Sequence, residues 1–198
     1  MEHYFTAKPS SKSAPRELTA VLRGETLRFR TDAGVFSRER IDPGTRLLAE
    51  SFELKPDATV LDLGCGYGPL GIVAARLAPR GRVYLVEINE RAAALARENL
   101  RLNGITNAEV RVGDGFAPVA DLTFDLILMN PPLRAGKRVV YPLIEEAFRH
   151  LRRGGSLYLV ARTRQGAGSL REHLRSVFGN GEDVERGGGY RVLRAVRE

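Results

Sequence analysis

The hydrophobic positions of this chain change their spacing regularly after residue 57. Short aliphatic and β-branched runs, typical of buried parallel strands, alternate with longer segments whose apolar residues recur every three or four positions. The short runs predict strands at 58–63, 82–87, 108–112, 124–129 and 156–161. The longer segments predict helices at 69–78, 90–102, 138–152 and 168–178. This alternation predicts an α/β fold with a Rossmann-like, mostly parallel sheet and helices on both of its faces.

The two ends of the chain follow a different pattern. Alternating runs at 18–22 and 26–29 flank Gly24 and predict a hairpin, and Asp42 followed by Pro43 predicts a helix start. A second hairpin is predicted from 184–186 and 190–196, so we expect the sheet to end in an antiparallel edge strand. The predicted organisation is a loosely ordered lead-in at 1–16 and one domain at 17–198, which includes the N-terminal hairpin and helix (17–56).

Composition bounds the class of protein. The chain has 198 residues, of which 43% are hydrophobic, and this suits one globular domain. No run approaches the ~18 apolar residues of a membrane span, and the first residues lack the layout of a signal peptide. We therefore expect a cytoplasmic protein without a membrane partner, and we favour a monomer. Cys65 is the single cysteine and the 3 histidines are scattered, so we predict no metal site.

The net charge of +7 is concentrated in the last third of the chain. Residues 1–50 carry 9 basic and 7 acidic side chains, residues 51–130 carry 8 and 10, and residues 131–198 carry 14 and 7. A basic region beside a ligand pocket suits a polyanion such as RNA. The alternative is a genome rich in arginine codons, since 27 of the 31 basic residues are Arg. Charge by itself therefore favours RNA as a partner but leaves both explanations open.

Residues 60–68 form a predicted nucleotide-binding corner. A strand leads into glycines at 64, 66 and 68, and an apolar helix follows, so the backbone turns tightly and a ligand can approach it closely. A dinucleotide site has a third glycine where this chain has Pro69. The pattern of the dehydrogenases is therefore broken.

Three acidic residues near strand ends indicate the ligand of this corner. Glu87 ends the second of the parallel strands, where a carboxylate accepts ribose hydroxyls. Asp114 is placed to accept a hydrogen bond from an adenine amino group, and Asp62 to hold an ammonium group. Because no phosphate-binding lysine accompanies them, the set predicts S-adenosyl-L-methionine rather than NAD or ATP. The predicted cofactor contacts are Asp62, Gly64, Cys65, Gly66, Gly68, Glu87, Ile88, Asp114, Gly115 and Asn130.

Asn130, Pro131 and Pro132 directly follow the fourth parallel strand and are the most specific chemical signal in the chain. The two prolines stiffen the backbone and remove two N–H donors, which leaves acceptors on a short arc. An exocyclic amine held by Asn130 Oδ1 and the Pro131 carbonyl has both hydrogens occupied, so its lone pair can turn toward a sulfonium methyl. Positioning and electrostatics then carry the transfer, without a separate general base before it. We predict these three residues to be catalytic.

These motifs resemble those of the class I S-adenosylmethionine-dependent methyltransferases. Residues 60–68 match the first motif of that family, Glu87 its ribose-binding acid and Asp114 its adenine-binding acid. The segments 34–37, 42–45, 130–137 and 189–193 are similar to its small methyltransferase-domain group, in the single-domain form. The resemblance implies a seven-stranded sheet with an antiparallel last strand. It also implies methylation of guanine N2, with ribosomal RNA or a ribosomal subunit as partner.

The substrate side departs from the family pattern at Leu133, where an aromatic residue is usual. Phe36 or Tyr141 can take the place of that stacking partner, although packing is the simpler role for each. Three cations after the catalytic loop are predicted to hold phosphates that flank the target, although a solvated helix start explains them equally well. The predicted substrate contacts are Phe36, Leu133, Arg134, Lys137 and Arg138.

Other functions stay open on the residues alone. A protein glutamine methyltransferase that acts on a translation factor uses the same type of catalytic motif. A non-catalytic RNA-binding or assembly factor with this fold is a hypothesis from another class. An NAD-dependent oxidoreductase is the least favoured, because of Pro69.

Overall fold

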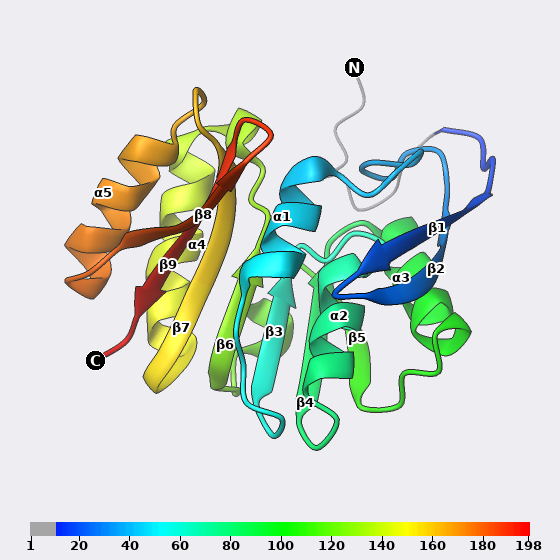
Figure 1. Cartoon of the computed structure of the whole chain (residues 1–198), viewed down its shortest axis with the longest axis horizontal. Coiled ribbons are helices and arrows are strands. Elements are labelled where there is room, and N and C mark those ends of the chain that lie inside the picture. The colour runs from blue at the N-terminus through cyan, green and yellow to red at the C-terminus, as the bar shows by residue number, and fades with distance from the viewer. Residues whose placement is uncertain (1–10) are drawn as a thin grey trace.

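Most strands of the chain pair into one mixed sheet that runs through the middle of the molecule (Figure 1). The computed structural model describes residues 11–198, so residues 1–10 of the predicted lead-in lie outside the described part. The strands are β1 (Arg16–Leu22), β2 (Glu25–Thr31), β3 (Thr59–Leu63), β4 (Arg82–Glu87), β5 (Ala108–Val112), β6 (Phe124–Met129), β7 (Leu151–Arg162), β8 (Glu182–Gly187) and β9 (Tyr190–Val196). The helices are α1 (Pro43–Ser51), α2 (Pro69–Leu77), α3 (Glu90–Leu102), α4 (Lys137–His150) and α5 (Ala167–Phe178).

The order of strands across the seven-stranded sheet is β5-β4-β3-β6-β7-β9-β8. The first five of these strands are parallel, and β9 is antiparallel to both of its neighbours. The predicted Rossmann-like fold with an antiparallel last strand is therefore confirmed. The last strand is not the edge of the sheet, however, because β8 lies outside it. Val192, Leu193 and Ala195 of β9 are buried, whereas β8 is polar and suits an edge.

The register of β3 against its two neighbours places three loops at one edge of the sheet. Leu63 pairs with Val86 of β4 and with Met129 of β6. The residues that follow are Gly64, Glu87 and Asn130, so the carboxyl ends of three adjacent parallel strands deliver them to the same place. Ligands of open α/β sheets bind at this edge.

Each face of the sheet carries its own apolar core. Along β6, Leu126 and Leu128 pack into the core on the side of α1, α2 and α3, and Ile127 and Met129 pack into the core on the side of α4 and α5. Figure 1 shows α1 and α2 in front of the sheet and α4 and α5 behind it. The central strands are apolar throughout because both of their faces are covered.

One predicted boundary is wrong. The helix predicted at 138–152 ends at His150, and β7 begins at Leu151, well before the predicted strand at 156–161. Leu151 lies four positions after Ala147, which continues the helical spacing of apolar residues. In the structure it is fully buried in the sheet opposite Phe124 of β6. Pairing between strands therefore overrides local periodicity at this position.

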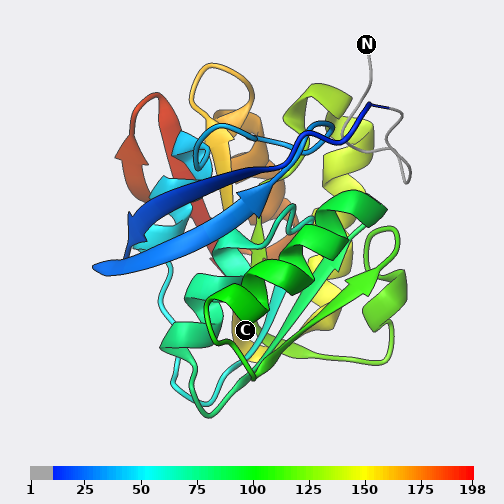
Figure 2. The same ribbon diagram turned by 90° about the vertical axis from the view of Figure 1, so that its right-hand side faces the viewer.

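The N-terminal hairpin confirms the predicted turn. Leu22 pairs with Glu25, so Arg23 and Gly24 form a two-residue loop, and both have positive φ, at +52° and +76°. Such loops match the right-handed twist of paired strands. The hairpin packs across α3, on the same side of the sheet as α1 and α2, as Figure 2 shows.

Two asparagines on α3 hold this hairpin. The side chain of Asn99 accepts from the backbone N–H of Arg30 at 2.7 Å and donates to the Arg30 carbonyl at 2.9 Å. Asn103 makes the same pair of bonds with the backbone of Arg28, at 3.0 and 2.7 Å. The two amides, one helical turn apart, thus pair with β2 as a neighbouring strand would. Asn99 also donates to the carbonyl of Tyr67, at 2.9 Å, and this bond connects the hairpin to the glycine loop.

We expect Asn99→Ala to lower the free energy of unfolding by about 3 kcal/mol, because it leaves the Arg30 N–H and the Arg30 and Tyr67 carbonyls without partners in a buried place. Urea unfolding measures this difference. Arg101→Ala, on the exposed side of the same helix, is the control and should cost within about 0.5 kcal/mol. Equal effects of the two substitutions would contradict the anchoring role of Asn99.

Candidate functional site

The glycine loop between β3 and α2 has the backbone shape that a ligand requires. Gly64, Gly66 and Gly68 have φ values of +72°, +56° and +99°, a region that favours glycine. A Cβ added at Gly64 or Gly66 would meet no atom within 4 Å, so both positions face open space. The backbone N–H groups of Gly64 and Cys65 both donate to the carbonyl of Val86, at 2.9 and 3.0 Å. The loop is therefore held from β4 and left open to a ligand.

Glu87 also holds the glycine loop. Its Oε2 accepts from the Gly66 N–H at 2.7 Å, and its Oε1 accepts from the Asn89 N–H at 2.9 Å. Burial raises the pKa of this carboxyl, although the backbone N–H groups of Asn89, Gly66 and Ile88 work in the opposite direction. The lone pairs that remain on the two oxygens are the acceptors a ribose would use, and that role stays a prediction for Glu87 and its neighbour Ile88.

Asp62 has one buried oxygen without a hydrogen-bond partner among the described residues. Its Oδ2 accepts from the Gly71 N–H at 2.8 Å, and its buried Oδ1 bonds to no residue that the structure describes. Burial raises the pKa of Asp62 to about 7, the Gly71 N–H opposes this shift, and the charge of Glu87 adds to it. A buried carboxylate without a countercharge is costly. The cofactor ammonium group would supply the missing partner.

The remaining predicted cofactor residues differ in their exposure. Asp114 is exposed at the end of β5, and Gly115 beside it has a φ of +52°. The Cys65 thiol is buried, lies 3.4 Å from the Gly66 carbonyl and has a pKa that burial raises well above its ordinary value. A protonated, buried thiol is a packing group and not a nucleophile.

Asn130 is held by the start of α1. Its Nδ2 donates to Thr45 Oγ1 at 2.9 Å and to Asp42 Oδ2 at 3.3 Å. Asp42 is the N-cap of α1, because the same Oδ2 accepts from the Thr45 N–H at 2.9 Å. Sequence reasoning identified Asp42 only as a cap and did not single out Thr45. Nothing local connects positions 88 residues apart, so only the fold reveals this contact.

The two prolines shape the loop after Asn130. The Pro131 carbonyl accepts from the Leu133 N–H at 2.8 Å, and the Pro132 carbonyl accepts from the Ala135 N–H at 2.8 Å. The first bond closes a tight three-residue turn around Pro132, and the second begins the short 3-10 turn at Leu133–Ala135. A carbonyl has two lone pairs, so Pro131 keeps one for a substrate N–H. The roles of the prolines as acceptor and support stay predictions.

The structure separates the two aromatic candidates for base stacking. Tyr141 stacks on His173 with ring centroids 3.7 Å apart, and Lys137 Nζ lies 5.7 Å from the centroid of the Tyr141 ring. Tyr141 is therefore a packing residue between α4 and α5. Phe36 is 43% exposed, on a loop whose Ser37 carbonyl accepts from Tyr67 of the glycine loop at 3.3 Å.

The predicted substrate contacts that follow Pro132 lie at the carboxyl edge of the sheet. Leu133 is half-buried and packs against the core of α4 and α5. The side chains of Arg134, Lys137 and Arg138 are exposed, and within residues 11–198 none of them forms an ion pair. Exposed, unpaired cations remain available to phosphate groups.

The fold and the site define the class of this protein. The sheet has an antiparallel last strand, and the glycine corner carries an unsatisfied carboxylate. An asparagine and two prolines follow the neighbouring strand. Together these features are typical of a class I S-adenosylmethionine-dependent methyltransferase. The model of the Methyltransferase small domain family matches residues 26–194. The chain belongs to this family, and S-adenosyl-L-methionine is its cofactor.

Similar proteins differ in how much of their length this chain spans. The uncharacterized protein YbxB of Bacillus subtilis (strain 168) is 41% identical, over 99% of this chain and 98% of that protein. Ribosomal RNA small subunit methyltransferase C of Pseudomonas entomophila (strain L48) is 36% identical, over 100% of this chain and 59% of that protein. A solved structure of the T. thermophilus 16S rRNA N2 methyltransferase RsmC, in complex with AdoMet and guanosine, has a TM-score of 0.84 at 29% identity. The match covers 96% of this chain and 52% of that one.

Two features are absent from the described residues. No helix in residues 11–198 is long and apolar enough to cross a membrane. The same part of the chain contains no group of three or more His, Cys, Asp or Glu side chains placed to hold a metal ion.

We expect S-adenosylmethionine to bind more weakly as the pH falls below about 7, because Asp62 must lose its proton to pair with the ammonium group. Asp62 alone should weaken binding by at most about tenfold per pH unit, and the raised pKa of Glu87 adds to this effect in the same direction. Calorimetric titration at a series of pH values measures the dissociation constant. Buffers of different ionisation enthalpy reveal the released proton.

Asp62→Asn should bind the cofactor more weakly and with a shallower pH dependence. Asp121→Asn, at an exposed position outside the site, serves as the control and should match the unmodified protein. A dissociation constant that stays level on both sides of pH 7 would show that Asp62 does not change its protonation state when the cofactor binds.

Proposed function

We propose that this chain is an RNA methyltransferase that acts on an exocyclic amine, namely guanine N2 of ribosomal RNA. The observation that carries the proposal is the orientation of Asn130 at the end of β6. Its amide nitrogen is occupied by Thr45 and Asp42, so its oxygen is the atom left to accept from a substrate amine. The names of the relatives from P. entomophila and T. thermophilus support an RNA substrate and, for the latter, the N2 position.

The chemistry of the transfer needs little from the protein besides position and acceptors. S-adenosylmethionine supplies an electrophilic methyl group. Asn130 Oδ1 and the free lone pair of the Pro131 carbonyl hold the two hydrogens of the amine, which directs its lone pair away from the base plane. That lone pair forms the new N–C bond, the electron pair of the C–S bond leaves with sulfur, and the nitrogen then releases one proton to water. The two acceptors stabilise the positive charge that develops on nitrogen.

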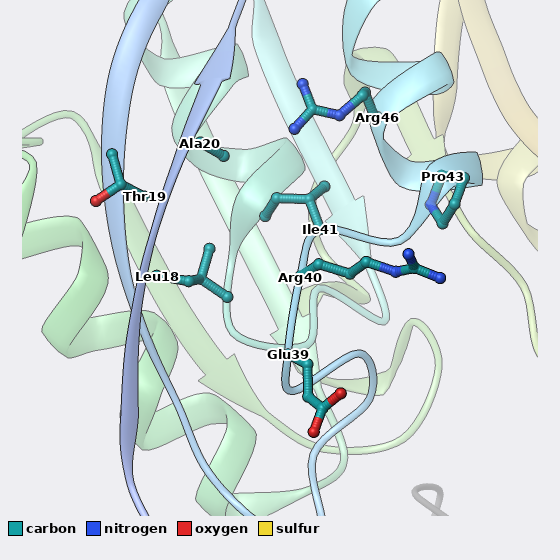
Figure 3. Close-up of a pocket in the computed structure, with 8 residues that line it drawn as sticks. All are labelled: Leu18, Thr19, Ala20, Glu39, Arg40, Ile41, Pro43 and Arg46. Carbon is teal, nitrogen blue, oxygen red and sulfur yellow. The ribbon is translucent and has the colours of Figure 1, made fainter.

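The surroundings of the site support RNA. Arg134, Lys137 and Arg138 lie exposed directly after the catalytic loop. A hollow of about 290 Å³ adjoins the start of α1, and Figure 3 shows Arg40 and Arg46 beside Ile41 in its lining. Guanidinium groups next to apolar surface suit the phosphates and bases of single-stranded RNA.

Asn130→Ala should lower the rate of methyl transfer by a factor of about 100 or more, because it removes a preorganised acceptor of the transition state. Its affinity for the cofactor should stay within a few-fold of the original. The assay is transfer from methyl-labelled cofactor to ribosomal RNA and to whole subunits, followed by nucleoside mass spectrometry. The expected product is N2-methylguanosine.

Several outcomes of this assay would reject the proposal. Label found only in protein would favour a glutamine-directed enzyme. Methylated adenosine would reject the guanine assignment. Full activity of Asn130→Ala would show that the amine is held elsewhere, and the absence of cofactor binding would favour the non-catalytic assembly factor.

Arg138→Glu should weaken RNA binding, because this cation lies at the carboxyl edge of the sheet beside the proposed catalytic loop. The slope of log K against log salt concentration should fall by about one phosphate contact. Arg153→Glu is a matched control, since Arg153 is equally exposed and also lacks an ion pair within residues 11–198. It lies near the amino end of β7, at the edge of the sheet opposite the site. Filter binding at several salt concentrations measures both slopes. If both variants lose affinity equally, net charge rather than position explains the binding.

A further inference from the structure

We infer that Asp42 and Thr45 are positioning residues for the transfer, which hold the Asn130 carboxamide with its oxygen toward the amine. The inference rests on the proposed function and assigns a catalytic duty to the start of α1. Neither residue touches the reacting atoms in this scheme. They act through Asn130, by deciding which end of its amide meets the substrate.

The orientation of the Asn130 amide follows from the chemistry of its two partners. Asp42 Oδ2 acts as an acceptor, since it also accepts from the Thr45 N–H, so the atom of Asn130 beside it is the nitrogen. Thr45 Oγ1, at 2.9 Å, is the second acceptor for the same nitrogen. A flipped amide would put its oxygen against the Asp42 carboxylate and present donors to an amine that itself donates. Both effects disfavour the flip.

Asp42 and Thr45 together form a clamp on the Asn130 amide, and this clamp is held rigidly by the packing of α1. The carbonyl of Asp42 accepts from the Arg46 N–H at 2.9 Å, as the first bond of α1. A Cβ added at Gly44 would lie 2.8 Å from the ring of Tyr190, so the start of α1 is pressed against β9. Thr45 is 8% exposed and Leu48, one turn on, is fully buried. The two acceptors therefore have little freedom to follow a misplaced amide.

The Thr45 hydroxyl is not needed to cap α1. The backbone N–H of Thr45 is already capped by Asp42. Within the described part of the chain, the bond from Asn130 is the one that the Thr45 hydroxyl makes. Valine has nearly the same shape as threonine, so replacing the hydroxyl leaves the helix and its packing in place. A purely structural role of Thr45 therefore predicts no catalytic effect of this change.

The test compares Thr45→Val with Thr45→Ser, which keeps the hydroxyl. We expect Thr45→Val to lower kcat by about tenfold, the effect of losing one hydrogen bond that orients a catalytic group. Its melting temperature should fall by no more than a few degrees, its KM for RNA and its affinity for the cofactor should be unchanged, and Thr45→Ser should restore kcat to within about threefold. The control is Ser51→Ala, which removes a hydroxyl from the far end of α1.

The double variant Asp42→Ser/Thr45→Val tests the whole clamp. Serine is as good an N-cap as aspartate, so α1 is kept, but its single hydroxyl can donate as well as accept and so no longer requires the amide nitrogen of Asn130 beside it. We expect kcat of the double variant to approach that of Asn130→Ala. The side-chain NH₂ signals of Asn130 in a ¹⁵N–¹H spectrum, assigned by their loss in Asn130→Ala, report the clamp without turnover. They should move and exchange faster with water in Thr45→Val, and should return with Thr45→Ser.

The outcomes separate this inference from the proposed function. Unmodified protein that methylates RNA, with Asn130→Ala inactive and Thr45→Val fully active, overturns the clamp and leaves the function intact. A loss of kcat that tracks a fall in melting temperature, or that is equal in the valine and serine variants, makes Thr45 structural. Unmodified protein without transfer to RNA overturns the function, and in that case unchanged NH₂ signals in Thr45→Val reject the clamp independently.

Discussion

The hydrogen-bonded register of β3 with β4 and β6 is the constraint on which the rest of this structure depends. One residue, Leu63, pairs with Val86 on one side and Met129 on the other. The next residue of each strand is therefore set beside the others, and these residues carry the backbone turn, the buried carboxylate and the amide of the site. A shift of one position in either pairing would turn each side chain to the opposite face of the sheet.

The N-terminal segment completes the site from outside the sheet. The hairpin is held by side-chain amides of α3, and Asn99 joins it to the glycine loop through the Tyr67 carbonyl. The loop at 34–40 then crosses that corner, where the Tyr67 hydroxyl donates to the Ser37 carbonyl, and leads into α1. Asp42 and Thr45 thereby reach Asn130 at the end of β6. Buried amides of this kind stabilise a structure only when all their hydrogen bonds are made.

Electrostatics divides the molecule into two regions with different tasks. Asp62 and Glu87 are buried carboxyls whose pKa is raised because they have been taken out of water. That cost is lowered when a cation or several N–H donors meet them, which suits the cofactor corner to a ligand with an ammonium group. The exposed cations after the catalytic loop lie in water, where their charge remains available for a polyanion.

Much of the fold and of the site was predictable from local sequence. Apolar runs and helical spacing predict the parallel strands and most helices, because each element must bury one stripe or two faces. The glycine corner and the Asn130 motif are local as well, since backbone conformation at 64–68 and the loss of two N–H donors at Pro131 and Pro132 depend on residue type. The end of α4 was not predictable in this way, because Leu151 fits a helical stripe and a strand equally well until Phe124 pairs with it.

The sequence by itself therefore determined most of the elements, the class of cofactor and the position of the motif at 130–132 that we predict to be catalytic. Tertiary structure decided that β9 lies inside the sheet, that the Tyr141 ring stacks on His173, and that the cap of α1 also bonds to Asn130. The physical reason is the range of the interactions. Periodicity, turns and caps act within a few residues, whereas partners for a strand, a ring or an amide are chosen among groups that only folding brings together.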